Sequence, residues 1–254
     1  MTSSEQKPVL LIRADGNQDD AAALAELGIE TVIDPYIRID KAENNAEALR
    51  MLDALKANGA KWLVATSVNA IRCFTELVGV DNLQAAIAAA ENLRFAAVGA
   101  RTAESLRELG AVDVLTPELS DSAALAEQLA GIGDAQTAII PSGLLAMKTL
   151  PSKLQAAGWN LIQGVVYTTV TVETPPASVV AANAGDFSAV IFRSPSAARA
   201  FLSFVPKPRM PLVAAGFTTA KVIKDAGLAV ASIPSNPTPK SVAAALQLLL
   251  EGER

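Results

Sequence analysis

Small polar residues recur in the turns where short apolar runs give way to helical patterns. Most of these turns place Ser, Thr, Asn or Gly just before an expected helix, where such residues cap the first turn. A capped helix start presents backbone N–H groups and the positive end of the helix dipole, which suits a ligand that carries several carboxylates. In any single turn, a serine or threonine more often caps the helix and does nothing else. The turns read IRADG (12–16), TSVNA (66–70), VGARTA (98–103), PSGLL (141–145), RSPSA (193–197) and AGFTTA (215–220).

Residue types that the sequence lacks exclude several kinds of chemistry. There is no histidine, so a Ser–His or Cys–His dyad and a histidine metal ligand are ruled out. The one cysteine, Cys73, cannot form an intramolecular disulfide or a structural zinc site alone. It shares an apolar helix face with Ile71, Phe74 and Leu77, which favours a core residue over a nucleophile. Neither G-x-G-x-x-G nor a P-loop occurs. We therefore expect no cofactor and no metal.

Composition and charge predict a globular protein with a large core. Of 254 residues, 51% are hydrophobic and 19% are charged, which is too apolar for a disordered chain. The net charge is −5 and no Lys/Arg cluster is present, so no nucleic-acid partner is expected. No apolar run approaches the ~20 residues of a membrane span, and the first residues do not resemble a signal peptide. With a single cysteine, this pattern predicts no membrane association and a cytoplasmic protein.

Short apolar runs alternate with longer helical patterns along the whole chain, which predicts an α/β fold with parallel sheets covered on both faces. Glycines 28, 110, 158 and 227 are placed to end helices, and Pro151 should delay or kink its helix. Strands are expected at 9–12, 31–34, 62–66, 95–98, 112–115, 137–141, 161–167, 189–193, 211–215 and 228–232. Helices are expected at 19–27, 46–58, 69–78, 102–109, 122–129, 145–157, 196–205, 219–226 and 241–250.

Internal repeats predict two similar lobes in an unusual order. Residues 63–78 match 190–205, residues 95–115 match 211–231, and residues 9–32 match 138–162 more loosely. The prediction is a discontinuous lobe of residues 1–36 and 174–254, an inserted lobe of residues 41–168, and a two-stranded linker of residues 37–40 and 169–173. Tyr36 and Tyr167 fall at the two crossings, where each either packs at a hinge or presents its phenol to a ligand.

Five motifs and the first strand together resemble the uroporphyrinogen-III synthase family over nearly the whole chain. The motifs are T-S-x-N-A (66–70), A-V-G-x-x-T-A (97–103), V-Y-x-T-V (166–170), S-P-S-A (194–197) and G-x-T-T-A (216–220), and the first strand ends at Arg13. The resemblance implies two lobes, each a flavodoxin-like parallel sheet with helices on both faces. The chain departs from the family pattern at residues 12–14, in the 141–148 loop and at Thr168, with fewer positive charges in the inserted lobe.

The resemblance also implies an activity. Members of this family are cofactor-independent lyases that cyclise hydroxymethylbilane with inversion of ring D and loss of water, by positioning the substrate in the interlobe cleft. The implied partners are this linear tetrapyrrole polycarboxylate and, transiently, the preceding pathway enzyme. Tyr167 is the expected catalytic residue. The expected substrate-binding residues are Arg13, Thr66, Ser67, Asn69, Gly99, Thr102, Ser142, Gly143, Ser194, Ser196, Gly216, Thr218 and Thr219.

Other readings stay open on the sequence alone. A two-lobed protein that binds an anionic small molecule without catalysis would show the same capped helix starts, and so would a divergent, inactive relative. A dehydrogenase or sugar-modifying enzyme of Rossmann type is disfavoured by the missing glycine fingerprint. Turnover of hydroxymethylbilane separates these readings.

Overall fold

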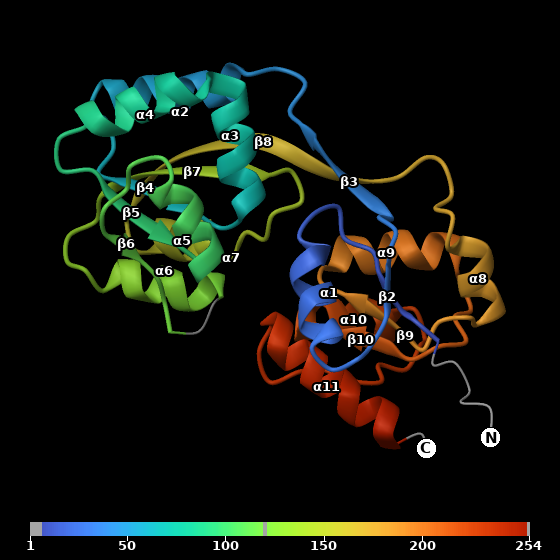
Figure 1. Ribbon diagram of the computed structural model, residues 1–254. Coiled ribbons are helices and arrows are strands. Elements are labelled where there is room, and N and C mark those ends of the chain that lie inside the picture. Colours follow the sequence, from blue (N-terminus) through green and yellow to red (C-terminus); the bar gives the residue numbers. More distant parts are fainter. Residues whose placement is uncertain (1–6, 119–120, 253–254) are drawn as a thin grey trace, which may run out of the picture. The chain divides into compact units, whose positions relative to one another are not determined.

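The chain divides into two compact units in the computed structural model (Figure 1). The structure describes residues 7–118 and 121–252. Unit 1 comprises residues 1–38 and 170–254, and unit 2 comprises residues 39–169. Each unit has its own sheet and its own hydrophobic clusters.

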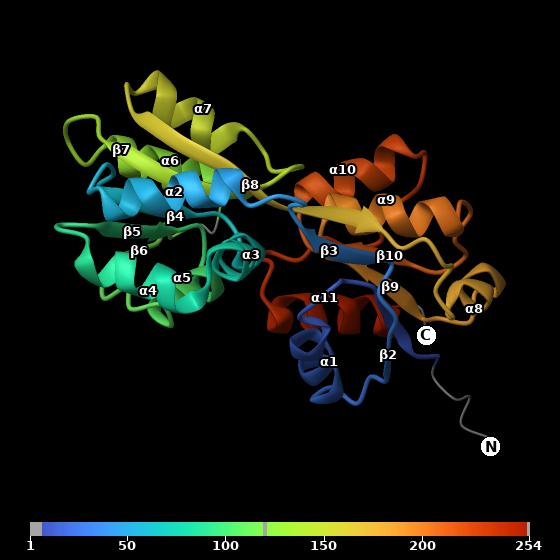
Figure 2. The same ribbon diagram turned by 90° about the horizontal axis from the view of Figure 1, so that it is seen from above.

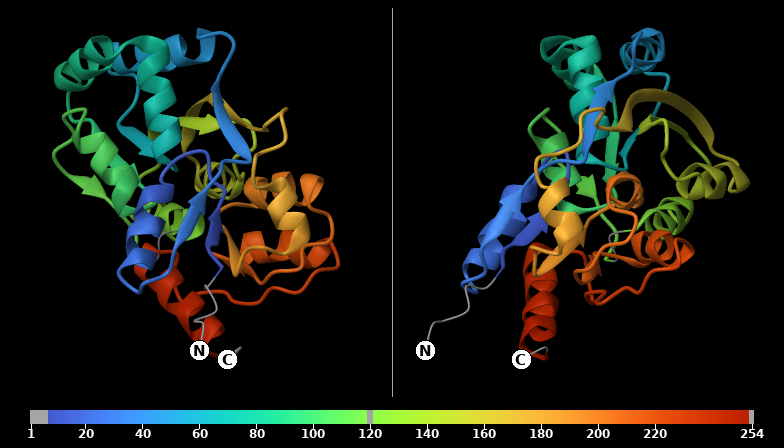
Figure 3. Two further views of the ribbon diagram at one scale, coloured as in Figure 1. Left: turned by 45° about the vertical axis from the view of Figure 1, so that its right-hand side comes forward. Right: turned by 90° about the vertical axis from the view of Figure 1, so that its right-hand side faces the viewer.

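Unit 1 is built on a parallel sheet in the order β10-β9-β1-β2. Alternate residues of β1 point to opposite faces, so Leu10 and Ile12 join one buried cluster while Val9 and Leu11 join the other. Helices α9 and α10 cover the first face, and α1 and α11 cover the second (Figure 2). Figure 3 shows α11 (red) beside α1 (blue). The strands are β1 (Val9–Leu11), β2 (Thr31–Ile33), β9 (Ala189–Phe192) and β10 (Leu212–Ala214). The helices are α1 (Asn17–Ala25), α8 (Val179–Ala184), α9 (Pro195–Phe204), α10 (Phe217–Asp225) and α11 (Pro239–Gly252).

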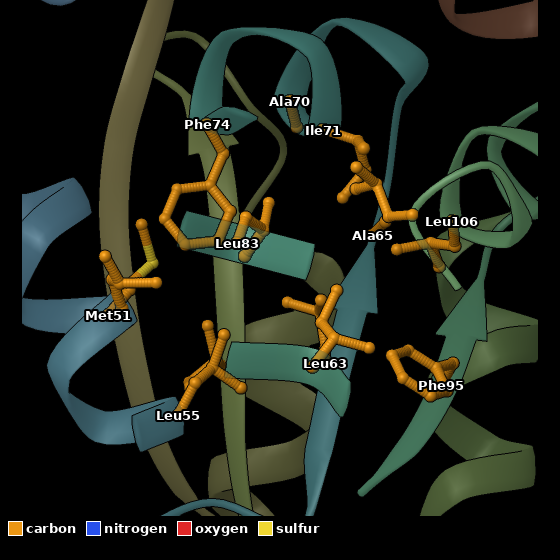
Figure 4. Close-up of a cluster of buried hydrophobic side chains, with 14 of the residues drawn as sticks. Met51, Leu55, Leu63, Ala65, Ala70, Ile71, Phe74, Leu83, Phe95 and Leu106 are labelled. Carbon is orange, nitrogen blue, oxygen red and sulfur yellow. The ribbon is translucent and has the colours of Figure 1, made fainter. Parts of the chain in front are cut away.

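Unit 2 repeats this arrangement around five parallel strands in the order β8-β7-β4-β5-β6, which belong to a six-stranded sheet. Figure 4 shows side chains of α2 (Met51, Leu55), α3 (Phe74), β4 (Leu63) and β5 (Phe95) gathered on one face. Residues of α6 and α7 form the cluster on the other face. The strands are β4 (Trp62–Ala65), β5 (Arg94–Ala97), β6 (Val114–Leu115), β7 (Thr137–Gly143) and β8 (Asn160–Thr171). The helices are α2 (Ala46–Lys56), α3 (Val68–Val78), α4 (Val80–Ala89), α5 (Ala100–Arg107), α6 (Ser122–Ala130) and α7 (Thr149–Ala156).

The strand orders agree with the repeats seen in the sequence. Strands β7 and β8 of unit 2 occupy the places of β1 and β2 in unit 1, and β4 and β5 occupy those of β9 and β10. Both units therefore have the flavodoxin-like order, and the chain enters unit 2 at a different strand. The predicted fold class, two α/β units with parallel sheets, is confirmed.

Strands β3 (Ile37–Lys41) and β8 carry the two crossings of the chain and are neighbours in the sheet. The Val172 N–H donates to the Tyr36 carbonyl at 3.1 Å, and the Ala42 N–H donates to the Val166 carbonyl at 3.0 Å. Residue numbers rise along one strand as they fall along the other, so the pair is antiparallel. The predicted linker segment 37–40 lies within β3, and residues 169–171 of the other segment lie within β8. The lobe boundaries at residues 36, 41, 168 and 174 stay a prediction.

Several local predictions were wrong. Residues 228–232 are not a strand, because they run beside the edge strand β10 for only two hydrogen bonds, Ala214 to Ser232 and Ala231 to Leu212. Helices α4 and α8 were missed: α4 follows α3 after Gly79 (φ +86), and α8 is only six residues long. Strand β8 is continuous where two strands were expected. The late start of α7 and the four glycines with positive φ at helix ends are as predicted.

Candidate functional site

The candidate site lies at the carboxyl end of the unit 2 sheet. The strand order reverses between β7 and β4, and open α/β sheets bind ligands at such a switch point. Ser67 lies two residues after the end of β4, and Ser142 and Gly143 are the last residues of β7. The topology therefore brings two of the polar turns found in the sequence to one place.

Tyr167 of β8 reaches this switch point. Its phenol oxygen lies 3.2 Å from Ser67 Oγ, across 100 residues of sequence. Ser67 Oγ also accepts the Ala70 N–H at 3.1 Å and so caps α3. The cap fixes the serine side chain, and the serine in turn orients the phenol. The Tyr167 ring is half-buried against the cluster of Figure 4, and its oxygen contacts a polar partner.

Gly143 provides the space for this ring. A Cβ at position 143 would lie 2.6 Å from Tyr167 Cζ, so only glycine leaves room for the ring here. The β7–β8 register shifts between Ser142 and Gly143, which pairs Gly143 with Tyr167. Beyond the shift, the Leu144 N–H donates to the Tyr167 carbonyl at 2.8 Å. Ser142 Oγ donates to the Gly164 carbonyl at 3.3 Å, and this bond ties the two strands together before the irregularity.

The other predicted residues of unit 2 lie on neighbouring turns. Thr66 is half-buried between β4 and Ser67. Asn69, in the first turn of α3, accepts a hydrogen bond from Arg72 at 3.4 Å. Gly99 has an extended backbone before α5, and no side chain among the described residues caps that helix. Thr102 is buried in α5, whereas Arg101 of the same turn is exposed.

Unit 1 carries matching turns. Ser194 caps α9 by accepting the Ala197 N–H at 3.2 Å, as Ser67 caps α3, and Ser196 follows it half-buried. Gly216 precedes α10 with the extended backbone seen at Gly99. Thr218 is exposed, whereas Thr219 is buried like Thr102.

Arg13 follows β1 in unit 1 and is fixed through its main chain. Its N–H donates to Asn17 Oδ1 at 3.2 Å, and its carbonyl accepts from Asn17 Nδ2 at 2.8 Å. The side chain of Asn17 is thereby held at the start of α1, and the 12–16 turn is closed.

Tyr36, the other tyrosine at a crossing, is a core residue of unit 1. Its hydroxyl lies 3.0 Å from Ser178 Oγ, and its ring packs 5.2 Å from Phe201 and 5.9 Å from Phe204, centre to centre. Burial raises the pKa of Tyr36, the Ser178 hydrogen bond lowers it, and the Asp34 carboxylate raises it. Asp34 also accepts the Ser178 N–H at 2.7 Å. Of its two predicted roles, packing is the one that the structure shows.

Sequence reasoning missed a buried ion pair behind the RSPSA turn. Arg193 Nε donates to Asp20 Oδ2 at 2.8 Å, and a second guanidinium nitrogen pairs with Asp20 Oδ1. The third nitrogen donates to the Pro237 carbonyl. The side chains are 9% and 2% exposed, so this pair fixes α1 and the segment before α11 against the carboxyl end of β9. The partners are 173 residues apart, and no local pattern signals the pair.

The largest hollow described away from these turns has no predicted site residue in its lining. A pocket of about 780 Å³ lies at the amino ends of β4, β5 and β6, and none of the predicted residues lines it. Within residues 7–118 and 121–252, no three His, Cys, Asp or Glu side chains gather as metal ligands. No helix in this part of the chain is long and apolar enough to cross a membrane.

Comparison with known proteins identifies the family. A family model described as uroporphyrinogen-III synthase HemD matches residues 18–244. The chain belongs to the uroporphyrinogen-III synthase family. A curated relative, the porphyrin biosynthesis protein HemD of Ruminiclostridium josui, is 25% identical over 206 residues. That match covers 79% of this chain and 40% of the relative, so the chain spans about two fifths of the relative's length.

Solved structures of two family members have the same fold. Uroporphyrinogen-III synthetase from Helicobacter pylori gives a TM-score of 0.66 at 16% identity, covering 98% of this chain and 100% of that one. A mutant uroporphyrinogen III synthase from Thermus thermophilus gives 0.63 at 17% identity, covering 96% and 99%. At these identities the family match, and not the structural likeness, carries the functional argument.

Proposed function

We propose that this protein is a uroporphyrinogen-III synthase that cyclises hydroxymethylbilane with inversion of ring D and loss of water. The observation that carries the proposal is the Tyr167–Ser67 pair at the switch point of unit 2 in a chain of this family. A positioned hydroxyl is the group that the first step needs, because that step removes a hydroxide from carbon.

The first step breaks the C–O bond of the hydroxymethyl group. The electron pair of the adjacent pyrrole nitrogen expels the leaving oxygen, and an azafulvene cation forms. Tyr167 donates its phenolic proton, or a hydrogen bond, to that oxygen, so that it departs as water. Ser67 Oγ, 3.2 Å away, is placed to donate its own proton toward the phenol oxygen as negative charge develops there.

The later steps require the substrate to be positioned and need no further proton donor from the protein. The cation attacks the substituted carbon of ring D and forms a spiro intermediate. That intermediate fragments at the neighbouring bond and recloses through the other ring D carbon, and loss of a ring proton restores the pyrrole. The substrate's own rings carry the positive charge. The protein holds ring D so that inversion competes successfully with direct closure, which is catalysis by orientation.

Helix starts supply the carboxylate contacts in this proposal, and each unit carries such turns. The turns capped by Ser67 and Ser194, and the extended turns at Gly99 and Gly216, present first-turn N–H groups. Such main-chain groups bind anions in addition to any charged side chain, so a net charge of −5 does not prevent the binding of a polycarboxylate.

One assay tests the proposal. Purified protein is mixed with hydroxymethylbilane, the products are oxidised, and the type I and type III isomers are separated. We expect the type III isomer in excess and faster loss of substrate than in buffer. Type I product at the buffer rate would refute the proposal. Tight binding of the bilane without turnover would then favour the non-catalytic binding protein.

Transient contact with the enzyme that makes the bilane, in the cytoplasm, completes the proposal. The pyrrole nitrogen can expel the hydroxyl in water as well, so a short transfer protects the substrate from closing to the symmetric isomer. In a coupled assay, an excess of catalytically inactive variant of this protein should then raise the type I fraction more than an unrelated protein does.

A further inference from the structure

Three large apolar side chains stand exposed in the segment that follows Gly143, the residue paired with Tyr167. Leu144, Leu145 and Met147 lie between β7 and α7 and are 63%, 60% and 57% exposed. Scattered exposed apolar residues are ordinary on protein surfaces, whereas a group of them calls for a reason. Elsewhere in residues 7–118 and 121–252, the large apolar side chains that are more than half exposed each stand alone in the sequence. They are Val112, Val180, Phe217 and Leu248.

The segment that carries these side chains is fixed in place. The Leu144 N–H donates to the Tyr167 carbonyl at 2.8 Å, and the Ala146 N–H donates to the Gly143 carbonyl at 3.0 Å. At its far end, Leu150 of α7 is fully buried. Both hydrogen bonds join the segment to the main chain of Gly143 and Tyr167, so the segment is anchored at the paired residues that carry the phenol.

We infer that Leu144, Leu145 and Met147 form an apolar surface that binds the face of a pyrrole ring of the substrate next to Tyr167. The inference rests on the proposed function and adds a specificity-determining contact to it. The substrate carries carboxylates, which helix N–H groups bind, and flat rings with apolar faces. Removing those ring faces from water by contact with apolar side chains is favourable. The Met147 thioether is suited to a ring face or edge because it is flexible and polarisable.

Salt separates this contact from the ionic ones. Charge interactions at the surface weaken as ionic strength rises, because the screening length falls from about 14 Å near 0.05 M to about 4 Å near 0.5 M salt. Apolar contact is not screened. The exposed Lys148, which follows Met147, provides the ionic reference within the same segment.

The test uses uroporphyrin III, a stable flat tetrapyrrole, as the probe, with binding followed by its fluorescence anisotropy. The variant Leu144→Ser/Leu145→Ser/Met147→Ser should raise the Kd roughly 30-fold, by the same factor at low and at high KCl. Lys148→Ala should raise the Kd only at low salt. A matched control, Val112→Ser/Val180→Ser/Leu248→Ser, removes as many exposed apolar side chains elsewhere and should leave the Kd within about twofold.

Turnover gives a second readout. The loop variant should raise KM for hydroxymethylbilane with little change in kcat, as expected for a contact made in both ground and transition states. An unchanged Kd and KM would overturn the inference, and so would equal losses in the loop variant and its control. If the wild type binds uroporphyrin III through the loop but forms no type III isomer, the proposed function fails while the ring contact stands. If it forms type III and the loop variant does so with wild-type KM, the inference alone fails.

Discussion

Gly143→Ala tests whether the placement of the Tyr167 ring depends on the missing side chain at position 143. The new Cβ would lie 2.6 Å from Cζ, 2.9 Å from Cε2 and 3.0 Å from Cε1 of Tyr167. Carbon atoms in contact are about 3.5–4.0 Å apart, so the ring must retreat by roughly 1 Å. The phenol is already 3.2 Å from Ser67 Oγ, and a retreat of that size breaks the hydrogen bond.

The cost follows from these two effects. Overpacking at a buried site costs about 1–3 kcal/mol, and the lost hydrogen bond adds about 1 kcal/mol, so unit 2 should lose about 2–4 kcal/mol of unfolding free energy. A catalytic group displaced by about 1 Å can lower turnover by about 10²-fold. Urea unfolding followed by tryptophan fluorescence measures the first effect in unit 2 alone, because both tryptophans, Trp62 and Trp159, belong to that unit and are buried.

Gly131→Ala is the matched control. Gly131 ends α6 with φ −82, and a Cβ there meets only carbonyl oxygens at 3.4 Å and beyond, so its stability change should stay within about 0.5 kcal/mol. Gly143→Ala combined with Tyr167→Ala should recover about 1–2 kcal/mol relative to the sum of the single changes, because the clash is gone. It should not recover turnover. If Gly143→Ala behaves like Gly131→Ala in both assays, the ring is not held against Gly143 and the reasoning is wrong.

Three further perturbations address the two tyrosines and the buried ion pair. Tyr167→Phe should lower turnover by about 10²-fold or less and barely change stability, since the pyrrole already expels the leaving group and the ring remains; isomer analysis with urea unfolding checks both. In the Tyr167→Phe variant, Tyr36 is the one remaining tyrosine. Burial favours its neutral phenol, so the tyrosinate absorbance of Tyr36 should appear with a pKa above the ordinary value of 10.0. The Tyr36 phenol therefore keeps its proton to a higher pH in the folded state than in the unfolded state. Its contribution to the free energy of unfolding is fully present below pH 10 and is lost as the pH rises through the raised pKa. A midpoint at or below 10 would contradict the burial argument. Asp20→Asn should lower the free energy of unfolding by about 3–5 kcal/mol, because it leaves the Arg193 guanidinium buried without a countercharge. The control Asp225→Asn, in an exposed pair with Lys221, should lower it by under about 1 kcal/mol. Unfolding followed by circular dichroism measures both.

Local patterns predicted the elements and the helix starts. The buried strand β4 is a continuous apolar run, and Ser67 and Ser194 cap their helices through bonds that span three residues. Internal repeats also predicted that the two units resemble each other, and the repeated segments occupy equivalent positions in the two strand orders. The weak points were local as well. The 228–232 run has a strand composition, but at the sheet edge it makes only two ladder hydrogen bonds.

Contacts between residues on different strands could not be predicted from the sequence. Tyr167 contacts Ser67 next to a register shift of the β7–β8 pair after Ser142. The residue types in the sequence do not predict such an irregular pairing. Gly143 was predicted as a ligand-binding residue, but its contact in the structure is with the Tyr167 ring. The Arg193–Asp20 pair depends on where α1 packs, which is a property of the folded unit 1.

The two units share their serine helix caps, and in the proposed mechanism the equivalent serines have different roles. Ser67 caps α3 and also contacts the Tyr167 phenol, whereas the bond that the structure shows for Ser194 Oγ is its cap on Ala197. Removing a cap weakens the helix start, and with it the carboxylate contact, by about 1 kcal/mol in either unit. Removing the phenol's partner affects the reacting step in addition. Ser194→Ala should therefore raise KM about fivefold with kcat preserved, and Ser67→Ala should raise KM similarly and lower kcat as well. Equal kcat in the two variants would show that the phenol acts without its serine.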